Sequence, residues 1–188
     1  MSLTITWKME KFLRCKANQK PHNHELLTHP WECVFDENST VLILGSFPSP
    51  KSREYGFYYG HSQNIFWKIL ARTIGQNKPM SDIASKKAFL LQNRIALWDV
   101  LHSCKIEGAA DGTIKCSAAN DFSYILKNSK IKAIFTTGKK ATELFQKLCA
   151  QKTGFKPIYL PSTSPANRAR QKSEDFLKEW KKINEFLE

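Results

Sequence analysis

Short apolar runs alternate along the chain with segments whose apolar residues recur at helical spacing. The first run, Val41 to Gly45, reads VLILG and contains no polar side chain, which is typical of a strand buried on both faces of a parallel sheet. Three later runs are also predicted as strands: Ile95 to Val100, Ile131 to Phe135 and Lys156 to Leu160. The pattern therefore predicts four strands.

Helical spacing follows each of the first three strands and also ends the chain. The predicted helices run from about Asn64 to Gly75, from Ser81 or Asp82 through Leu91, from Asn120 or Asp121 through Leu126, from Ala141 to Leu148 and from Phe176 to Phe186. Strands that alternate with helices are joined by right-handed crossovers. We expect an α/β fold, a three-layer α/β/α sandwich with a central, mostly parallel four-stranded sheet.

Two segments stand outside this alternation. Residues 1–40 are largely polar after a few apolar positions, and we expect them to be an N-terminal appendage to a single domain that spans residues 1–188. The segment between His102 and Ala119 contains two glycines and many small residues with little periodicity, so it is predicted to be an irregular excursion.

Two loops rich in serine and proline follow predicted strands. The first runs from Ser46 to Asn64 and begins SFPSP, where the prolines interrupt both a strand ladder and a helix. The second, LPSTSPANRAR, runs from Leu160 to Arg170. Because ligands bind at the carboxyl ends of strands in open α/β sheets, we expect the two loops to meet in space and form a site.

The net charge of the chain indicates what kind of partner it binds. The chain has 29 Lys and Arg against 17 Asp and Glu, a formal net charge of +12, which favours a polyanion such as nucleic acid. No apolar run approaches the ~20 residues of a membrane span, and the first residues do not resemble a signal peptide. We therefore expect no membrane partner and a cytoplasmic protein.

Several kinds of chemistry lack their sequence patterns. The five cysteines have no CxxC spacing, which argues against disulfides and thiolate zinc sites. His22, His24, His29 and Cys33 lie close in sequence and could hold a metal, but their gaps match no standard ligand pattern. GSFPSPKS is neither GxGxxG nor GxxxxGK[ST], and no serine lies in a GxSxG elbow. We expect no metal and no cofactor.

Three motifs together resemble the uracil-DNA glycosylase superfamily: GSFPSPKS, YGHSQNIFWKIL and LPSTSPANR. WDVLHSCKIEGAADGTI and NDF also resemble its hypoxanthine-DNA (deoxyinosine) glycosylase family, and the resemblance extends from Val41 to the C-terminus. It implies an enzyme that flips a deaminated base, hypoxanthine or uracil, out of DNA and hydrolyses its N-glycosidic bond in base excision repair. It also implies a monomer whose partner is DNA with a damaged base.

The catalytic residue implied by the resemblance is Asn64. Phe47 stands where many members of the superfamily carry an Asp or Asn that positions water, and Asn64 of the Asn-x-Phe-Trp run takes over this role in the hypoxanthine-type family. Judged from the residues alone, capping the helix that it begins is the commoner role of an Asn at such a position. Asp99 is the rival carboxylate, although it could instead accept hydrogen bonds from loop amides.

The resemblance also implies a base pocket and a DNA-binding surface. Tyr59 would stack on the flipped base, and the amides of Ser46 and Phe47 would stabilise the base as it departs. Expected substrate-binding residues are Gly45, Ser46, Phe47, Pro48, Tyr59, Phe66, Asn120 and Ser162. Expected DNA-binding residues are Ser49, Lys51, Ser52, Arg53, Lys139, Lys140, Ser164, Asn167, Arg168 and Arg170. Ala166 falls where relatives insert a bulky wedge into the duplex, so any wedge here is small or made by the backbone.

Two other functions remain open at the level of sequence. One is a basic nucleic-acid-binding module that shares the fold but lost the chemistry with the residue at Phe47. The other is a small-molecule hydrolase with a cationic surface, which would act on free nucleosides and bind DNA weakly.

Overall fold

The computed structural model describes residues 26–76, 80–105 and 114–187, and its centre is a four-stranded sheet. The strands are β2 (Val41–Gly45), β3 (Ile95–Asp99), β6 (Ala133–Thr137) and β7 (Ile158–Leu160), in the order β3-β2-β6-β7. Every neighbouring pair is parallel. The predicted strand Val41 to Gly45 is confirmed, whereas β6 begins two residues later than predicted and β7 is shorter than its predicted run.

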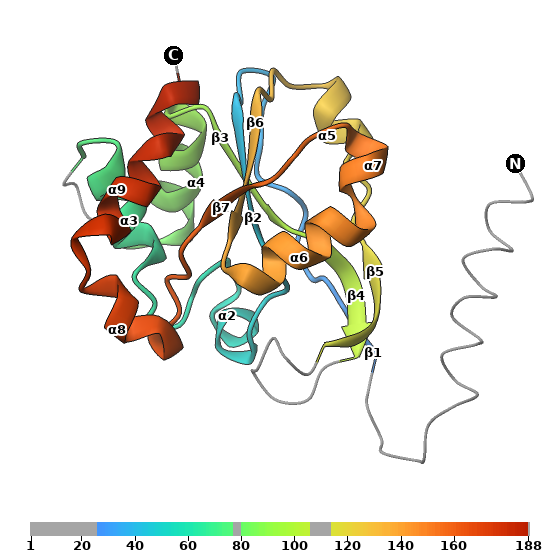
Figure 1. Ribbon diagram of the computed structural model, residues 1–188, viewed down its shortest axis with the longest axis horizontal. Coiled ribbons are helices and arrows are strands. Elements are labelled where there is room, and N and C mark those ends of the chain that lie inside the picture. The colour runs from blue at the N-terminus through green and yellow to red at the C-terminus, as the bar shows by residue number, and fades with distance from the viewer. Residues whose placement is uncertain (1–25, 77–79, 106–113, 188) are drawn as a thin grey trace, which may run out of the picture.

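Helices cover both faces of this sheet, as Figure 1 shows with the sheet seen nearly edge-on. One face carries α3 (Phe66–Thr73), α4 (Ile83–Gln92) and α9 (Glu174–Lys181), which continues into the 3-10 helix η3 (Lys182–Phe186). The other face carries α5 (Ser123–Lys127), α6 (Lys139–Leu148) and α7 (Ala150–Thr153). The predicted three-layer α/β/α sandwich is confirmed.

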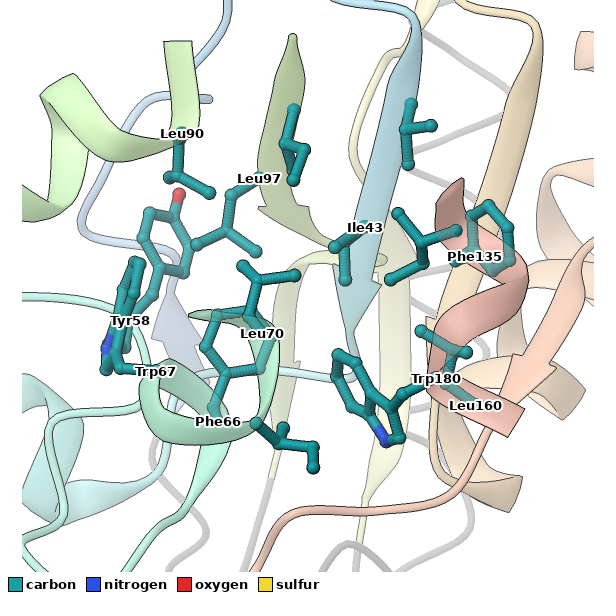
Figure 2. Close-up of a cluster of buried hydrophobic side chains, with 14 of the residues drawn as sticks. Ile43, Tyr58, Phe66, Trp67, Leu70, Leu90, Leu97, Phe135, Leu160 and Trp180 are labelled. Carbon is teal, nitrogen blue, oxygen red and sulfur yellow. The ribbon is translucent and has the colours of Figure 1, made fainter. Parts of the chain in front are cut away.

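Alternation along the strands divides the core into two clusters. Val41 and Ile43 of β2 point to the side of α3, α4 and α9, where Phe66, Leu70 and Trp180 have no exposed surface. Figure 2 shows these helix side chains converging on the strand side chains. Leu42 and Leu44 point to the opposite side, toward Ile125, Leu144 and Phe145. The central strand is therefore buried on both faces, as its unbroken apolar run indicated.

A second sheet corrects the prediction for residues 102–119. Its strands, β1 (Leu26–Thr28), β4 (Leu101–Lys105) and β5 (Lys115–Ala119), are antiparallel in the order β1-β4-β5. The predicted irregular excursion is therefore wrong for the described part of this segment, and residues 106–113 lie outside that part. Register shifts between β4 and β5 interrupt the period of two, so the alternation that marks a strand is weak in the sequence.

Residues 26–40, which belong to the expected N-terminal appendage, pack against the body of the molecule. Leu26–Thr28 pairs with β4, and Val34 forms an antiparallel bridge with Leu97 of β3. Ser39 and Thr40 are buried, and Thr40 donates its amide to the carbonyl of Arg94. Residues 1–25 lie outside the described part of the chain.

Both Ser-Pro pairs begin helical turns, which corrects the prediction that the first loop has no helix. Ser49 caps α2 (Pro50–Tyr55) by accepting the amide of Ser52, with Pro50 as the first helical residue. Ser164 caps the 3-10 helix η2 (Pro165–Asn167) in the same way, and α8 (Arg168–Gln171) follows. Proline is tolerated at the first helical position because the amide that it lacks would have no partner there.

Candidate active site

Three residues form a polar row across the carboxyl ends of the parallel strands: Gly45, Asp99 and Thr137. The strand register puts Gly45 beside Asp99 on β3 and, through the Leu44–Thr136 pair, beside Thr137 on β6. All three lie on the face that carries α3 and α9, because they continue the alternation of Ile43, Leu97 and Phe135. A Cβ on Gly45 would overlap Oδ1 of Asp99 and lie 3.0 Å from Oη of Tyr59. Glycine is therefore required for this close approach.

Tyr59 lies over this row in a left-handed backbone conformation, with φ of 52°. Its hydroxyl is 2.7 Å from Oγ1 of Thr137, which in turn donates to the carbonyl of Leu44. The ring stacks on Phe66 at 3.8 Å with an interplanar angle of 5°. Because Phe66 is fully buried, it supports Tyr59 from behind.

The turn from Gly45 to Pro48 accepts backbone hydrogen bonds from the segment that follows β3. Val100 donates its amide to the carbonyl of Gly45 at 2.9 Å, and Leu101 donates to that of Ser46 at 3.1 Å. Ser46, Phe47 and Pro48 are all buried. The Phe47 ring packs into the cluster on the α5 and α6 face and is part of the core.

Asn120 binds the backbone at the end of β3. Its Nδ2 donates to the carbonyl of Asp99 at 2.9 Å, and its backbone amide donates to that of Val100. It is 8% exposed. Asn120 therefore stabilises the end of β3 beside the polar row.

The two loops meet, as predicted. Ile65 donates its amide to the carbonyl of Thr163 at 3.3 Å, and Gly138 donates to that of Leu160 at 2.8 Å. Ser162 lies against Gly138, whose Cβ would be 3.2 Å from that of Ser162. The second loop is anchored to α9 by Trp180, whose Nε1 donates to the carbonyl of Pro161. Within the described residues, the buried hydroxyl of Thr163 has no hydrogen-bond partner.

Asn64 lies at the seam between these loops, next to Ile65. Its Oδ1 accepts the amide of Phe66 at 3.0 Å, and its own amide donates to the carbonyl of His61. The side chain is half-buried. The N-cap of α3 is Ile65, which makes no side-chain cap bond, so Asn64 accepts the first helical amide from one position before the cap. Its Oδ1 keeps a second lone pair for another donor.

The predicted DNA-binding residues of the first loop differ in exposure. Ser49 caps α2, and Ser52, 4% exposed, accepts the amide of Gly60, so both hydroxyls are engaged within the protein. Arg53 donates to the carbonyl of Pro48 at 2.7 Å. Lys51 is exposed and pairs with Glu54 on the surface. Among these four, Lys51 is the side chain most accessible to a phosphate.

The remaining predicted DNA-binding residues follow β6 and β7, at the same edge of the sheet. Lys139 and Lys140 open α6, and Arg168 and Arg170 are exposed on α8. Figure 1 shows α2, α8 and the start of α6 at one end of the molecule. Asn167 and Ser164 instead stabilise their own loop: Asn167 donates to the carbonyl of Ser162, and Ser164 caps η2.

His29, which the sequence offered only as a candidate metal ligand, contacts Asp99 of the polar row. Its Nε2 lies 2.9 Å from Oδ2 of Asp99, and the side chains of the pair are 1% and 5% exposed. Its Nδ1 faces the backbone of Trp31. In the metal hypothesis, His22 and His24 lie outside the described residues, and among the described residues no group of three or more possible ligands gathers.

Burial also shifts the acidity of side chains around this pair. It raises the pKa of the Tyr58 hydroxyl, which donates to the carbonyl of Glu32, and the nearby Asp99 acts in the same direction. Burial likewise raises the pKa of the Cys33 thiol. Both groups therefore stay protonated at neutral pH and have no role as anions.

Within the described residues, no helix combines the length and the apolar character needed to cross a membrane.

The fold and the two loops are those of the DNA glycosylases in the uracil DNA glycosylase superfamily, and the chain belongs to this superfamily, whose family model matches residues 33–188. A protein of Methanosarcina acetivorans named hypoxanthine DNA glycosylase is 36% identical over 161 residues, which cover 84% of this chain and 98% of that protein. A protein of the same name from Methanosarcina barkeri is 39% identical over 142 residues, or 74% of this chain and 88% of that protein.

A solved structure agrees with these matches. The solution NMR structure of a candidate uracil DNA glycosylase from Methanosarcina acetivorans superposes with a TM-score of 0.73 and 34% identity, covering 87% of this chain and 99% of that one. The resemblance read from the motifs is thereby confirmed at the level of the superfamily and of relatives named for hypoxanthine.

Proposed function

We propose that this protein is a monofunctional DNA glycosylase that excises hypoxanthine from DNA, with uracil as the second base to test. The observation that carries the proposal is the meeting of the two Ser-Pro loops beside Tyr59 at the carboxyl edge of the sheet. The names of the relatives support hypoxanthine as the first candidate base, and the superfamily match supports uracil.

The substrate base must leave the DNA stack to reach this edge. Tyr59 is suited to receive it, because Phe66 and Thr137 hold its ring in one orientation. Stacking on an aromatic side chain stabilises a flipped base by ~1–3 kcal/mol. Gly45 lies beside the Tyr59 hydroxyl, and the amides of Ser46 and Phe47, which follow it, can stabilise the negative charge that develops on the departing base.

The reaction itself is a hydrolysis. The bond between C1′ of the sugar and the base nitrogen breaks, a water oxygen bonds to C1′, and the proton that water loses ends on the base or in solvent. Asn64 orients that water through the free lone pair of Oδ1 or through its amide N–H groups. The neutral amide is a weak base, but the sugar carries positive charge in the transition state, so attack by water needs little activation.

The DNA backbone is bound by the cations at this end of the molecule. Four of these side chains are exposed: Lys51 in the first loop, Arg168 and Arg170 in the second, and Lys139 after β6. We propose that each approaches a phosphate, whereas Ser49 and Ser52 act by holding the first loop in shape. We further propose that the protein acts as a monomer on chromosomal DNA inside the cell.

The test is incubation of the purified protein with duplexes that carry hypoxanthine or uracil at one position, followed by alkali to break the strand at abasic sites. We expect strand breaks at hypoxanthine in the presence of EDTA, and no covalent adduct after borohydride treatment, because the proposed mechanism needs neither a metal nor a lysine nucleophile. An undamaged duplex is the control.

Two outcomes would contradict the proposal. Tight binding to the damaged duplex without base release would favour a non-catalytic nucleic-acid-binding module. Release of bases from free nucleosides, together with weak affinity for DNA, would favour a small-molecule hydrolase.

A further inference from the structure

The side chain of His29 is almost completely enclosed by the protein. Four aromatic rings surround it with centroid distances of 5.8 to 6.4 Å: Trp31, Phe47, Tyr58 and Trp98. Its side chain is 1% exposed, and its only carboxylate contact among the described residues is Asp99. The backbone of Trp31 fixes the other side of the ring through Nδ1.

The imidazole is linked to the turn from Gly45 to Phe47 in two ways, one through Asp99 and one direct. It reaches Gly45 through Asp99, whose Oδ1 packs against the Cα of that glycine while Oδ2 faces His29. It reaches Phe47 directly, edge to face at 5.9 Å. The peptide groups between these points carry the amides that the proposed mechanism directs at the departing base. The position of His29 is therefore coupled to that of the turn.

We propose that His29 is a positioning residue of the glycosylase site: it orients the Asp99 carboxylate and thereby holds the turn from Gly45 to Phe47 in its working position. This inference rests on the proposed function. His29 lies outside residues 33–188, the part of the chain that the superfamily model matches, whereas Asp99 lies within it. The N-terminal segment thus supplies a residue to the site.

A positioning role predicts an effect on the chemical step and little effect on DNA affinity. A side chain that is 1% exposed does not contact a phosphate, and the exposed cations on α6 and α8 are not among its contacts. If the Asp99 carboxylate loses the partner of Oδ2, it rotates toward another donor, because a buried polar group without a partner is unfavourable. The turn then loses the geometry on which catalysis depends.

The experiment compares three variants. His29→Phe keeps an aromatic ring and removes both nitrogens, His29→Gln keeps an N–H that reaches Asp99, and His102→Phe alters an exposed histidine of β4 as the matched control. Single-turnover release of hypoxanthine and affinity for an undamaged duplex are measured well below each melting temperature. If His29→Phe does not fold, His29→Asn, whose amide is too short to reach Asp99, replaces it.

We expect His29→Phe to slow base release about 10- to 100-fold while the dissociation constant for DNA changes less than about threefold. His29→Gln should recover most of the lost rate, and His102→Phe should match the wild type. A His29→Phe variant that is as fast as the wild type would overturn the proposal. So would a His29→Gln variant that is as slow as His29→Phe, because that would indicate packing alone.

A second readout does not depend on activity. In ¹⁵N-labelled protein, the amide resonances of Gly45, Ser46 and Phe47 should shift in His29→Phe and return in His29→Gln, while those of Arg168 and Arg170 stay in place. If the wild type fails to release any base, the proposed function fails but these shifts still test the positioning role. Unchanged turn resonances in a folded His29→Phe variant would refute it.

Discussion

At the scale of single residues, Asn64 combines two roles that a mutation can separate. Asn64→Ala removes the group proposed to orient water, so we expect single-turnover base release to fall ~100-fold or more, equivalent to a barrier increase of ~2.7 kcal/mol. It also removes the bond to the Phe66 amide, which costs about 1 kcal/mol of stability. Quenched-flow kinetics and thermal melts measure the two effects.

Asn64→Asp is the matched variant, because a carboxylate accepts the Phe66 amide as an amide oxygen does. It should melt close to the wild type and show a changed rate or base preference, since it brings a negative charge to the site. Full activity in both variants, with only a lower melting temperature in Asn64→Ala, would leave Asn64 as a helix cap and move the chemistry to Asp99 or another residue.

The contact between the hydroxyl groups of Tyr59 and Thr137 can also be tested by substitution of single residues. Tyr59→Phe and Thr137→Val each remove one partner of the 2.7 Å contact while keeping the ring and the β-branched side chain. We expect each to slow base release ~10-fold, about 1.4 kcal/mol, because the aromatic platform loses its anchor.

A double-mutant cycle tests whether the two act as a pair. Tyr59→Phe/Thr137→Val should be no slower than the slower single variant, since the same contact is lost only once. Thr153→Val, on α7, is the control and should leave the rate unchanged. Fully additive effects would show that the hydroxyls act separately.

At the scale of elements, two exposed lysines flank strand β6 and therefore lie at opposite ends of the parallel strands. Lys139 follows the carboxyl end beside the two loops, and Lys132 precedes the amino end. If DNA lies across the carboxyl edge, Lys139→Ala should lower the slope of log affinity against log salt by about one unit, since each phosphate contact contributes ~0.9. Lys132→Ala should leave the slope unchanged.

Fluorescence anisotropy at several salt concentrations measures both slopes with an undamaged duplex. Equal slopes for the two variants and the wild type would remove Lys139 from the interface. A smaller slope in Lys132→Ala alone would place the DNA at the amino edge, away from the proposed site.

At the scale of the whole molecule, the buried thiols make stability depend on alkaline pH. Burial raises the pKa of Cys149 from 9.0 to about 11, although Lys152 opposes the shift. Between these pH values the unfolded chain has lost the thiol proton while the folded chain retains it, so the free energy of unfolding falls as pH rises from 9 to 11. In Cys149→Ala, the free energy of unfolding measured with urea should decline less across this pH range. An identical decline in both proteins would contradict the assignment to Cys149.

The elements that the sequence predicted well are those whose signal is local. VLILG specifies β2 because five consecutive residues without a polar side chain suit a strand covered on both faces, and Asp82 caps α4 where the sequence indicated it. The Ser-Pro loops could be placed at the carboxyl edge because parallel strands end there together. The start of α2 at Pro50 was missed, although the Ser-Pro pair itself carries the signal.

Pairing between distant segments was decided only by the tertiary structure. The strand β4 pairs with β1 on one side and with β5 on the other, and no periodicity within residues 102–119 indicates this pairing. The contact between His29 and Asp99 spans 70 positions, and nothing in the sequence near either residue indicates that the two meet. By itself the sequence determined the apolar strands, the helices between them and the loops that form the site, because these depend on neighbouring residues. The tertiary structure decided which polar groups meet there, because burial and hydrogen bonding between distant residues exist only after the chain has folded.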